Sequence, residues 1–110
     1  MALLIVRHKI KDYSTWKPVF DQSEDLRKEY GFKGGYICRG ETDANDLFVV
    51  LECESLSRAR EFMALPKLRE WMNKAGVIGE PDIYYLDELE RVHELMTARQ
   101  QATAGETWGD

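Results

Sequence analysis

Residues 3–10 read LLIVRHKI, and this stretch decides how the rest of the chain is arranged. In a β-strand successive side chains point to opposite faces, so the even-numbered residues, His8 among them, form one face and the odd-numbered residues form the other. Both faces begin with apolar residues, which predicts a strand that is covered on both sides. His8 is the ionisable member of the even-numbered face, and we expect that face to lie under helices.

A helix rich in aromatic residues is expected directly after this strand. Asp12 and Ser14 offer capping oxygens, and Pro18 favours the first turn of a helix because it has no N–H to leave unpaired there. We therefore predict a short turn over residues 13–16 and then a helix that continues to Tyr30. Its buried stripe has helical spacing and consists of Trp16, Val19, Phe20, Ser23, Leu26 and Tyr30.

Three further strands are predicted from alternation and from turn-forming residues. Strands over residues 33–40 and 47–54 flank the polar loop ETDAND, which is the signature of a hairpin. The connector VIGEP leads to a last strand over residues 82–89, which holds an apolar and aromatic run. Parity along that strand allows only one of its two tyrosines to face the helices, and the sequence does not decide between Tyr84 and Tyr85.

Between the hairpin and the last strand the pattern is helical. Ser57 is expected to cap a helix over residues 58–65, and Pro66 restarts a second segment over residues 67–75 that stops at Gly76. The order of elements is then β-α-β-β-α-β, which predicts an α+β fold of the ferredoxin-like kind, with a four-stranded antiparallel sheet and helices on one face.

Length and composition predict one domain and exclude several classes of partner. The 110 residues suffice for a single core, which we place over residues 1–90, followed by a helical extension to about Arg99 and a flexible tail within residues 91–110. A net charge of -5 without a Lys/Arg cluster makes nucleic acid a poor partner. No apolar run approaches the roughly 20 residues that cross a bilayer, so no membrane association is expected.

The spacing of the cysteines and histidines predicts neither a redox motif nor a metal site. Cys38 and Cys53 lack a CxxC spacing, and the long hairpin loop is expected to offset them, so we predict free thiols and a cytoplasmic location. His8 and His93 are far apart in the sequence and no cysteine pair has ligand spacing, so no metal site is expected.

The sheet is expected to have one uncovered face. With all helices on one side, Leu3, Ile5, Phe48 and Val50 lie on the other, and exposing such a patch is unfavourable by roughly 25 cal/mol per Å² of apolar area. A second copy of the same sheet is the simplest cover, so we predict a homodimer.

At this point the chain resembles the dimeric α+β barrel proteins and, within them, the antibiotic biosynthesis monooxygenase-like family. The resemblance spans roughly residues 2–90 and is carried by the order of elements and by the passages RHKIKDYSTWKPVF, LFVVLECESLSRAREFM and LPKLREWMNKAGV. The family includes oxygenases that act on phenolic polyketides without metal or flavin, haem-degrading enzymes, and small proteins without known activity.

The resemblance also implies which positions would bind haem. The haem-degrading members have an Asn on the first strand, a Trp on the second helix and a His in its later turn, and these positions correspond here to His8, Phe62 and Met72. None of the three residue types is retained, and Met72 is at best a weak axial ligand. Haem degradation is therefore a distant third hypothesis, and no cofactor is expected.

The residues that can carry chemistry are few. His8 can exchange a proton near neutral pH, although a histidine bonded to one backbone carbonyl, or one at a solvent-facing strand end, is the more common case. Tyr85, with Tyr84 and Tyr36 as alternatives, brings a phenol that can hold an enolate oxygen. Arg7 and Arg39 can bind an anion, although pairing with nearby glutamates is the more common use. A pocket for a flat apolar ligand is expected to be lined by Trp16, Phe20, Tyr36, Phe62, Trp71 and Met72.

Two functions are consistent with these residues. The first, which the resemblance implies, is a cofactor-independent monooxygenase in which His8 deprotonates a small phenolic substrate and a tyrosine or tryptophan holds the oxyanion. The second is a non-catalytic protein, either a binder that holds an apolar small molecule in the same pocket or a stress-related dimer. The absence of a second strong acid or base near His8 favours the second function.

Overall fold

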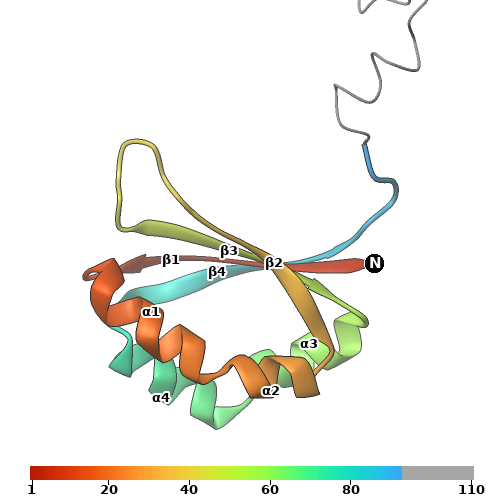
Figure 1. The fold of residues 1–110 in the computed structure, drawn as a ribbon, viewed down its shortest axis with the longest axis horizontal. Helices are drawn as coiled ribbons and strands as arrows, with labels where there is room; N and C mark the ends of the chain where they lie inside the picture. The colour runs from red at the N-terminus through yellow and green to blue at the C-terminus, as the bar shows by residue number, and fades with distance from the viewer. Residues whose placement is uncertain (93–110) are drawn as a thin grey trace, which may run out of the picture.

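A computed structural model describes residues 1–92 of the chain, and it has four antiparallel strands with four helices (Figure 1). The strands lie in the order β2-β3-β1-β4. All four helices lie below the sheet in Figure 1, and the predicted ferredoxin-like α+β fold is therefore confirmed. The strands are β1 (Ala2–Ile10), β2 (Phe32–Arg39), β3 (Asp46–Cys53) and β4 (Val77–Asp87), and the helices are α1 (Tyr13–Gln22), α2 (Glu24–Glu29), α3 (Leu56–Met63) and α4 (Pro66–Lys74).

The register of β1 against its neighbours places His8 on the helix-covered face, as predicted. His8 pairs with Leu47 of β3, and the residues of β1 two and four positions earlier pair with Val49 and Leu51. Paired residues of neighbouring strands share a face of the sheet. Because Leu47 and Val49 are buried, this face carries the core.

The core fills the space between the sheet and the helices. Leu4, Ile10, Leu47 and Cys53 are the largest fully buried side chains, and α1 and α3 contribute further apolar residues to the same cluster. Removing this apolar surface from water stabilises the fold by roughly 25 cal/mol per Å². The cluster also fixes the strand that carries His8, because Leu4 and Val6 precede it on the same face.

The first helical segment is broken where the sequence predicted one continuous helix. Asp12 caps α1, since its carboxylate accepts a hydrogen bond from the Thr15 amide at 2.8 Å, and the helix thus begins before Pro18. At Ser23 the helix ends and α2 starts. The Ser23 amide and hydroxyl both donate to the carbonyl of Phe20, at 3.2 and 2.9 Å. These local bonds compete with the regular helical pattern, which explains the break.

Two further boundaries differ from the prediction. Ser55, not Ser57, caps α3, because its hydroxyl accepts from the Arg58 amide at 3.2 Å. The last strand begins at Val77 and includes the connector VIGEP, with Gly79 at positive φ. Pro81 is compatible with this edge position, where a strand can lack one donor. Residues 88–92 are not helical, and the rest of the predicted C-terminal extension lies outside the described residues.

Strand β2 approaches β3 so closely that a glycine is required at one position. A Cβ added at Gly35 would lie 1.8 Å from the Val50 carbonyl oxygen, whereas one added at Gly34 would meet nothing within 4 Å. Both glycines have nearly the same φ, 155° and 153°, so Gly34 is a matched control. We expect Gly35→Ala to lower the free energy of unfolding by about 1–3 kcal/mol more than Gly34→Ala in urea denaturation. Equal losses would contradict the assigned pairing of β2.

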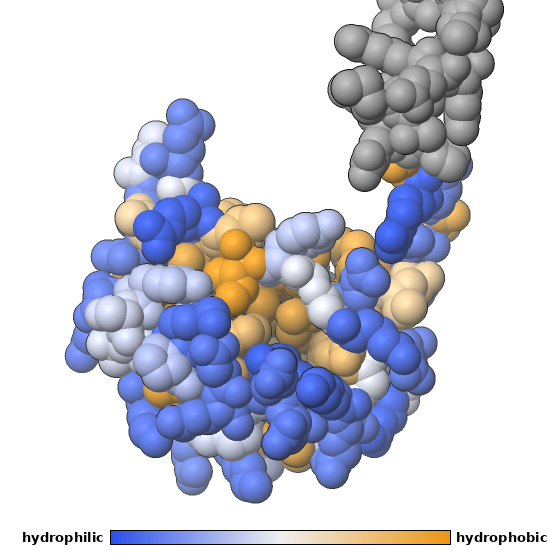
Figure 2. Space-filling view, viewed as in Figure 1, coloured by the Kyte–Doolittle hydropathy of each residue, from blue (hydrophilic) through white to orange (hydrophobic). Residues whose placement is uncertain are grey.

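Within residues 1–92, no helix covers the other face of the sheet. Register places Leu3, Ile5, Phe48 and Val50 on it, as predicted, because Leu3 pairs with Glu52, Ile5 with Val50, and Arg7 with Phe48. In Figure 2 hydrophilic residues cover most of the helical layer, and hydrophobic ones gather at the level of the sheet. Figure 1 shows that the β2–β3 loop and residues 88–92 both rise on this side. The exposed apolar residues here include Tyr36, Tyr84 and Leu86, at 68%, 48% and 42%.

Within residues 1–92, none of the helices combines the length and the apolar character that crossing a membrane requires. Cys38 is exposed and Cys53 is buried, and both are free thiols, as predicted. The two lie apart because Cys38 pairs across the hairpin with Phe48, whereas Cys53 pairs with Phe32.

Candidate functional site

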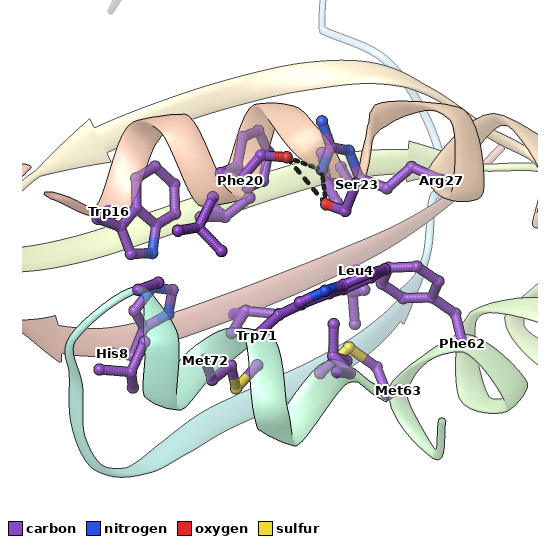
Figure 3. Close-up of a pocket in the computed structure, with 17 residues that line it drawn as sticks. Leu4, His8, Trp16, Phe20, Ser23, Arg27, Phe62, Met63, Trp71 and Met72 are labelled. Atoms are coloured by element: carbon purple, nitrogen blue, oxygen red, sulfur yellow. Dashed lines mark hydrogen bonds between the residues drawn. The ribbon is translucent and has the colours of Figure 1, made fainter. Parts of the chain in front are cut away.

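A hollow lies between the sheet and the helices, and most of the predicted pocket residues line it (Figure 3). It measures about 580 Å³ with its open mouth included. Six residues predicted from the sequence form part of the wall: His8, Trp16, Phe20, Phe62, Trp71 and Met72.

His8 is a buried polar residue of this wall. Its side chain is buried, with 6% of the residue exposed, and its ring centroid lies 5.7 Å from that of Trp16. Neither ring nitrogen, Nδ1 nor Nε2, has a hydrogen-bond partner among the described residues. The expectation of a histidine satisfied by a backbone carbonyl, or of one facing solvent, is therefore wrong. An unpartnered imidazole in an apolar cavity is able to bind a polar group of a ligand.

Burial lowers the pKa of His8 below its ordinary value of 6.5, because the charged imidazolium loses its hydration, and the charge of Asp46 opposes this only in part. The ring is therefore neutral at pH 7. A neutral imidazole has one nitrogen that accepts a proton and one that donates a hydrogen bond. This is the form that a general base needs.

The same pKa shift gives a prediction for stability. Between the folded pKa and 6.5 the unfolded chain binds more protons at His8, so the free energy of unfolding rises with pH across that window and the contribution is lost as pH falls through it. We expect urea unfolding of the wild type to show this dependence below about pH 6.5, and His8→Leu to lack it. Identical pH profiles of the two proteins would show that the imidazole titrates as in the unfolded chain.

Aromatic rings form two walls of the hollow. Trp16 and Phe20 of α1 are stacked, with centroids 4.8 Å apart and planes at 17°, and Tyr13 stacks on the outer side of Trp16 at 5.8 Å. In Figure 3, Trp71 and Met72 of α4 lie on the side of the hollow opposite the α1 residues. Two facing apolar walls favour a flat ligand between them.

Phe62 of α3 lies at the end of the hollow away from His8 (Figure 3). It is buried and packs edge-on against Phe32 at 5.0 Å and Tyr30 at 5.7 Å. The three positions that the resemblance related to haem binding, His8, Phe62 and Met72, all line the same cavity. Neither Phe62 nor Met72 adds a nitrogen ligand there.

The predicted tyrosines are not part of the cavity wall. Tyr85 pairs with Leu4 and so faces the helices, which settles the choice between the two tyrosines, but the Arg60 guanidinium lies over its ring at 4.1 Å. Tyr36 pairs with Val50 and lies on the uncovered face. The expectation that Tyr36 lines the pocket is therefore wrong. Tyr84 pairs with Ile5 on that same face.

Sequence reasoning missed two polar residues of the cavity, Ser23 and Arg27. Ser23 was counted only as part of a buried stripe, and Arg27 was not considered, although it follows Ser23 by four residues and Phe20 by seven on the same side of the helical segment. The position of Arg27, four and seven residues after two members of the buried stripe, could have indicated that it lies beside the cavity. The arginines considered instead lie elsewhere: Arg7 pairs with Asp46 at 2.9 Å, and Arg39 lies over Tyr13 at 5.3 Å.

Comparison with known proteins identifies the fold. No protein-family model and no curated protein matches the chain. Solved structures do match: a protein from Bordetella bronchiseptica described as an antibiotic biosynthesis monooxygenase has a TM-score of 0.67 at 13% identity, over 81% of this chain and 97% of that one. SnoaB from Streptomyces nogalater, described as a cofactor-independent oxygenase, has a TM-score of 0.66 at 12% identity, over 84% and 97%.

A third structure, from Caulobacter crescentus and also described as an antibiotic biosynthesis monooxygenase, has a TM-score of 0.64 at 17% identity, over 81% of this chain and 90% of that one. Nearly the whole of each of these chains is matched. The fold is thus that of antibiotic biosynthesis monooxygenase-like proteins, as the sequence resemblance predicted. At these sequence identities the similarity establishes the fold alone, and only the residues of the cavity bear on the chemistry.

Proposed function

We propose that this protein is a cofactor-independent monooxygenase that acts on a small phenolic substrate bound between the sheet and the helices. The observation that carries the proposal is His8, whose two ring nitrogens have no partner among the described residues and face an apolar, aromatic-lined cavity. The fold is shared with SnoaB, which is described as a cofactor-independent oxygenase, and this supports the same class of reaction.

The chemistry uses His8 as a general base. The ring CH₂ group of a phenolic substrate such as a hydroxylated anthrone loses one C–H proton to the imidazole, and the anion that forms is electron-rich because it is delocalised into the rings and the carbonyl. The anion passes one electron to O₂, a C–O bond forms at the former CH₂ carbon, and the imidazolium returns the proton to give a hydroperoxide. Loss of water leaves a ketone, so the balance is R₂CH₂ + O₂ → R₂C=O + H₂O.

Tyr85 was the expected partner of His8 in holding the oxyanion, and we do not retain it in that role because Arg60 covers its ring outside the cavity wall. Trp71 is the better candidate, since it lines the hollow and is not fully buried. An indole N–H can donate one hydrogen bond to a developing oxyanion.

We further propose that the protein is a homodimer formed through the uncovered face of the sheet. Ile5, Val50 and Tyr84 form the apolar centre of this face. Its periphery is polar, with the Arg7–Asp46 pair toward one end and Glu52 near Arg91 at the other. An apolar centre with a charged rim is the usual composition of a homodimer interface. A second copy in two-fold symmetry would cover the patch on both chains.

The two free thiols are consistent with a protein that is located in a reducing compartment. Cys38 is exposed, and an exposed thiol persists where glutathione and thioredoxin keep it reduced. We therefore propose a cytoplasmic location.

A second candidate function is a non-catalytic binder of apolar small molecules. The observation that favours it is the composition of the cavity: of the groups that line it, His8 is the one that exchanges a proton near neutral pH, since Arg27 stays charged. A binder needs the aromatic walls but no proton transfer.

Oxygen uptake separates the two functions. With a hydroxylated anthrone as substrate, the enzyme is expected to consume one O₂ per ketone formed, and ¹⁸O₂ is expected to label the new carbonyl oxygen. Binding of the same compound, seen as a change in Trp16 and Trp71 fluorescence, without oxygen uptake above the buffer rate would establish the binder. Uptake with the label absent from the ketone would contradict a monooxygenase reaction.

A further inference from the structure

Arg27 is held at the rim of the cavity by contacts that fix its direction. Its guanidinium lies over the Phe20 ring, with Cζ 3.8 Å from the ring centroid. Nη1 donates to the Phe20 carbonyl oxygen at 2.7 Å and to the Ser23 hydroxyl at 2.5 Å (Figure 3). Both of the hydrogen bonds that Arg27 donates within residues 1–92 begin at Nη1, and none begins at Nε or Nη2. A guanidinium with unused donors presents a planar fork that suits a carboxylate.

The charge of Arg27 has no counter-ion within the described part of the chain. Asp21 and Glu24 act on it only at a distance, and neither lies within 4.0 Å of its nitrogens. Its partial burial lowers its pKa, which reflects the cost of removing the guanidinium from water. Arg58 shows the contrast: it also lies over an aromatic ring, that of Tyr30 at 4.3 Å, but it pairs with Glu61 at 3.2 Å.

In Figure 3, His8 lies at one end of the hollow, and Arg27 lies on its helical side, beside Phe20 and Ser23 and farther along toward Phe62. Trp16, the ring nearest His8, and Ser23, the hydroxyl bonded to Arg27, are seven residues apart along α1 and its end. At about 1.5 Å per residue this spans roughly 10 Å. A two-ring aromatic skeleton with a substituent at each end can bridge such a distance, and the walls along it are apolar, among them Val19 and Leu51.

We propose that the ligand of this cavity is a flat aromatic acid whose carboxylate binds Arg27 while its hydroxyl or carbonyl oxygen meets His8. Arg27 is then the residue that selects acids over neutral aromatic compounds. The inference rests on the proposed function for the role of His8. It adds the anionic substituent, which that function does not require.

The test compares two probes of the same shape, 6-hydroxy-2-naphthoate and its neutral carboxamide, by quenching of tryptophan fluorescence at pH 7 and low salt. The wild type is expected to bind the acid at least about tenfold more tightly than the amide, because a charge-assisted, two-point hydrogen bond is worth that ratio. Arg27→Gln is expected to bring the two dissociation constants together, and Arg27→Lys to retain part of the difference. Arg58→Gln is the matched control and is expected to keep the full preference.

The neutral amide separates the possible failures. If Arg27→Gln weakens acid and amide equally, Arg27 only supports the junction of α1 and α2, and the proposal is overturned. Equal affinities of the wild type for both probes would overturn it without any variant. If the acid and the amide bind equally and the His8→Leu variant weakens the binding of the amide, the acid selectivity is refuted but the proposed function stands. If neither probe binds at millimolar concentration, both the acid selectivity and the aromatic pocket of the proposed function are refuted.

Discussion

Replacing His8 by leucine is expected to lower turnover at least 100-fold without destabilising the protein. A positioned general base contributes about 10²–10⁴-fold to a rate, and leucine cannot accept a proton. In the folded protein the two unpartnered ring nitrogens are buried, and a buried unsatisfied polar group costs about 1–3 kcal/mol. Leucine fills the same space without that cost, so the free energy of unfolding is expected to stay equal or to rise by about 1 kcal/mol.

The two effects are measured on the same preparation, by oxygen uptake with a hydroxylated anthrone and by urea unfolding at pH 7. His8→Gln is the matched control, because glutamine keeps a donor and an acceptor but does not take up a proton near neutral pH. It is expected to lose the activity without gaining stability. Activity of the His8→Leu variant would show that the imidazole takes no part in the reaction. A loss of several kcal/mol in stability would show that the ring nitrogens are satisfied in the folded protein.

The second large effect is expected for Tyr84→Glu, which places a carboxylate in the centre of the uncovered face. In a single chain Tyr84 is 48% exposed, so glutamate there remains hydrated and the fold tolerates it. In the proposed dimer the residue is buried in the interface, and two-fold symmetry introduces the charge twice. Burying an unpaired charge costs several kcal/mol, so the dimer dissociation constant is expected to rise on the order of 100-fold or more.

Sedimentation velocity over a wide range of protein concentrations measures this change. Ala64→Glu is the control, since Ala64 is exposed on the helical layer, away from the proposed interface, and receives the same charge. The control is expected to sediment as a dimer where Tyr84→Glu sediments as a folded monomer. A wild type that is monomeric at every concentration, or a Tyr84→Glu protein that dimerises like the wild type, would contradict pairing through the sheet.

The parts of the fold that depend on the periodicity of apolar residues and on the order of helices and strands were predicted from the sequence. Alternation in residues 3–10 grouped His8 with the even-numbered residues, and the expected antiparallel pairing with residues 47–54 placed that group under the helices. The order of elements was sufficient to predict the sheet and its bare side. Boundaries were less certain because they depend on competing local bonds. Ser55 and Ser57 are both good caps, and the selection of Ser55 follows from where β3 ends.

Site residues were predicted correctly only where they lie on a regular helix or strand and the sequence showed which face of that element they occupy. Tyr36 and Tyr85 needed the register between strands, which the hairpin loop leaves open: Tyr36 proved to pair with Val50 on the bare face, and Tyr85 to face the helices. Arg27 was missed because arginine at a helix surface is normally solvated. Its side chain turns back over Phe20 because the helix breaks at Ser23, and helical period alone does not predict that break.

The proposed function depends most directly on contact between the unpartnered imidazole of His8 and the ligand inside the cavity. The most direct measurement is the ¹⁵N chemical shifts of the His8 ring in histidine-labelled protein, before and after saturation with 6-hydroxy-2-naphthoate. We predict a neutral ring at pH 7 in the free protein and a shift of at least one ring nitrogen on binding, of the size that a new hydrogen bond or proton transfer produces. Binding that leaves both nitrogen shifts unchanged would contradict the account.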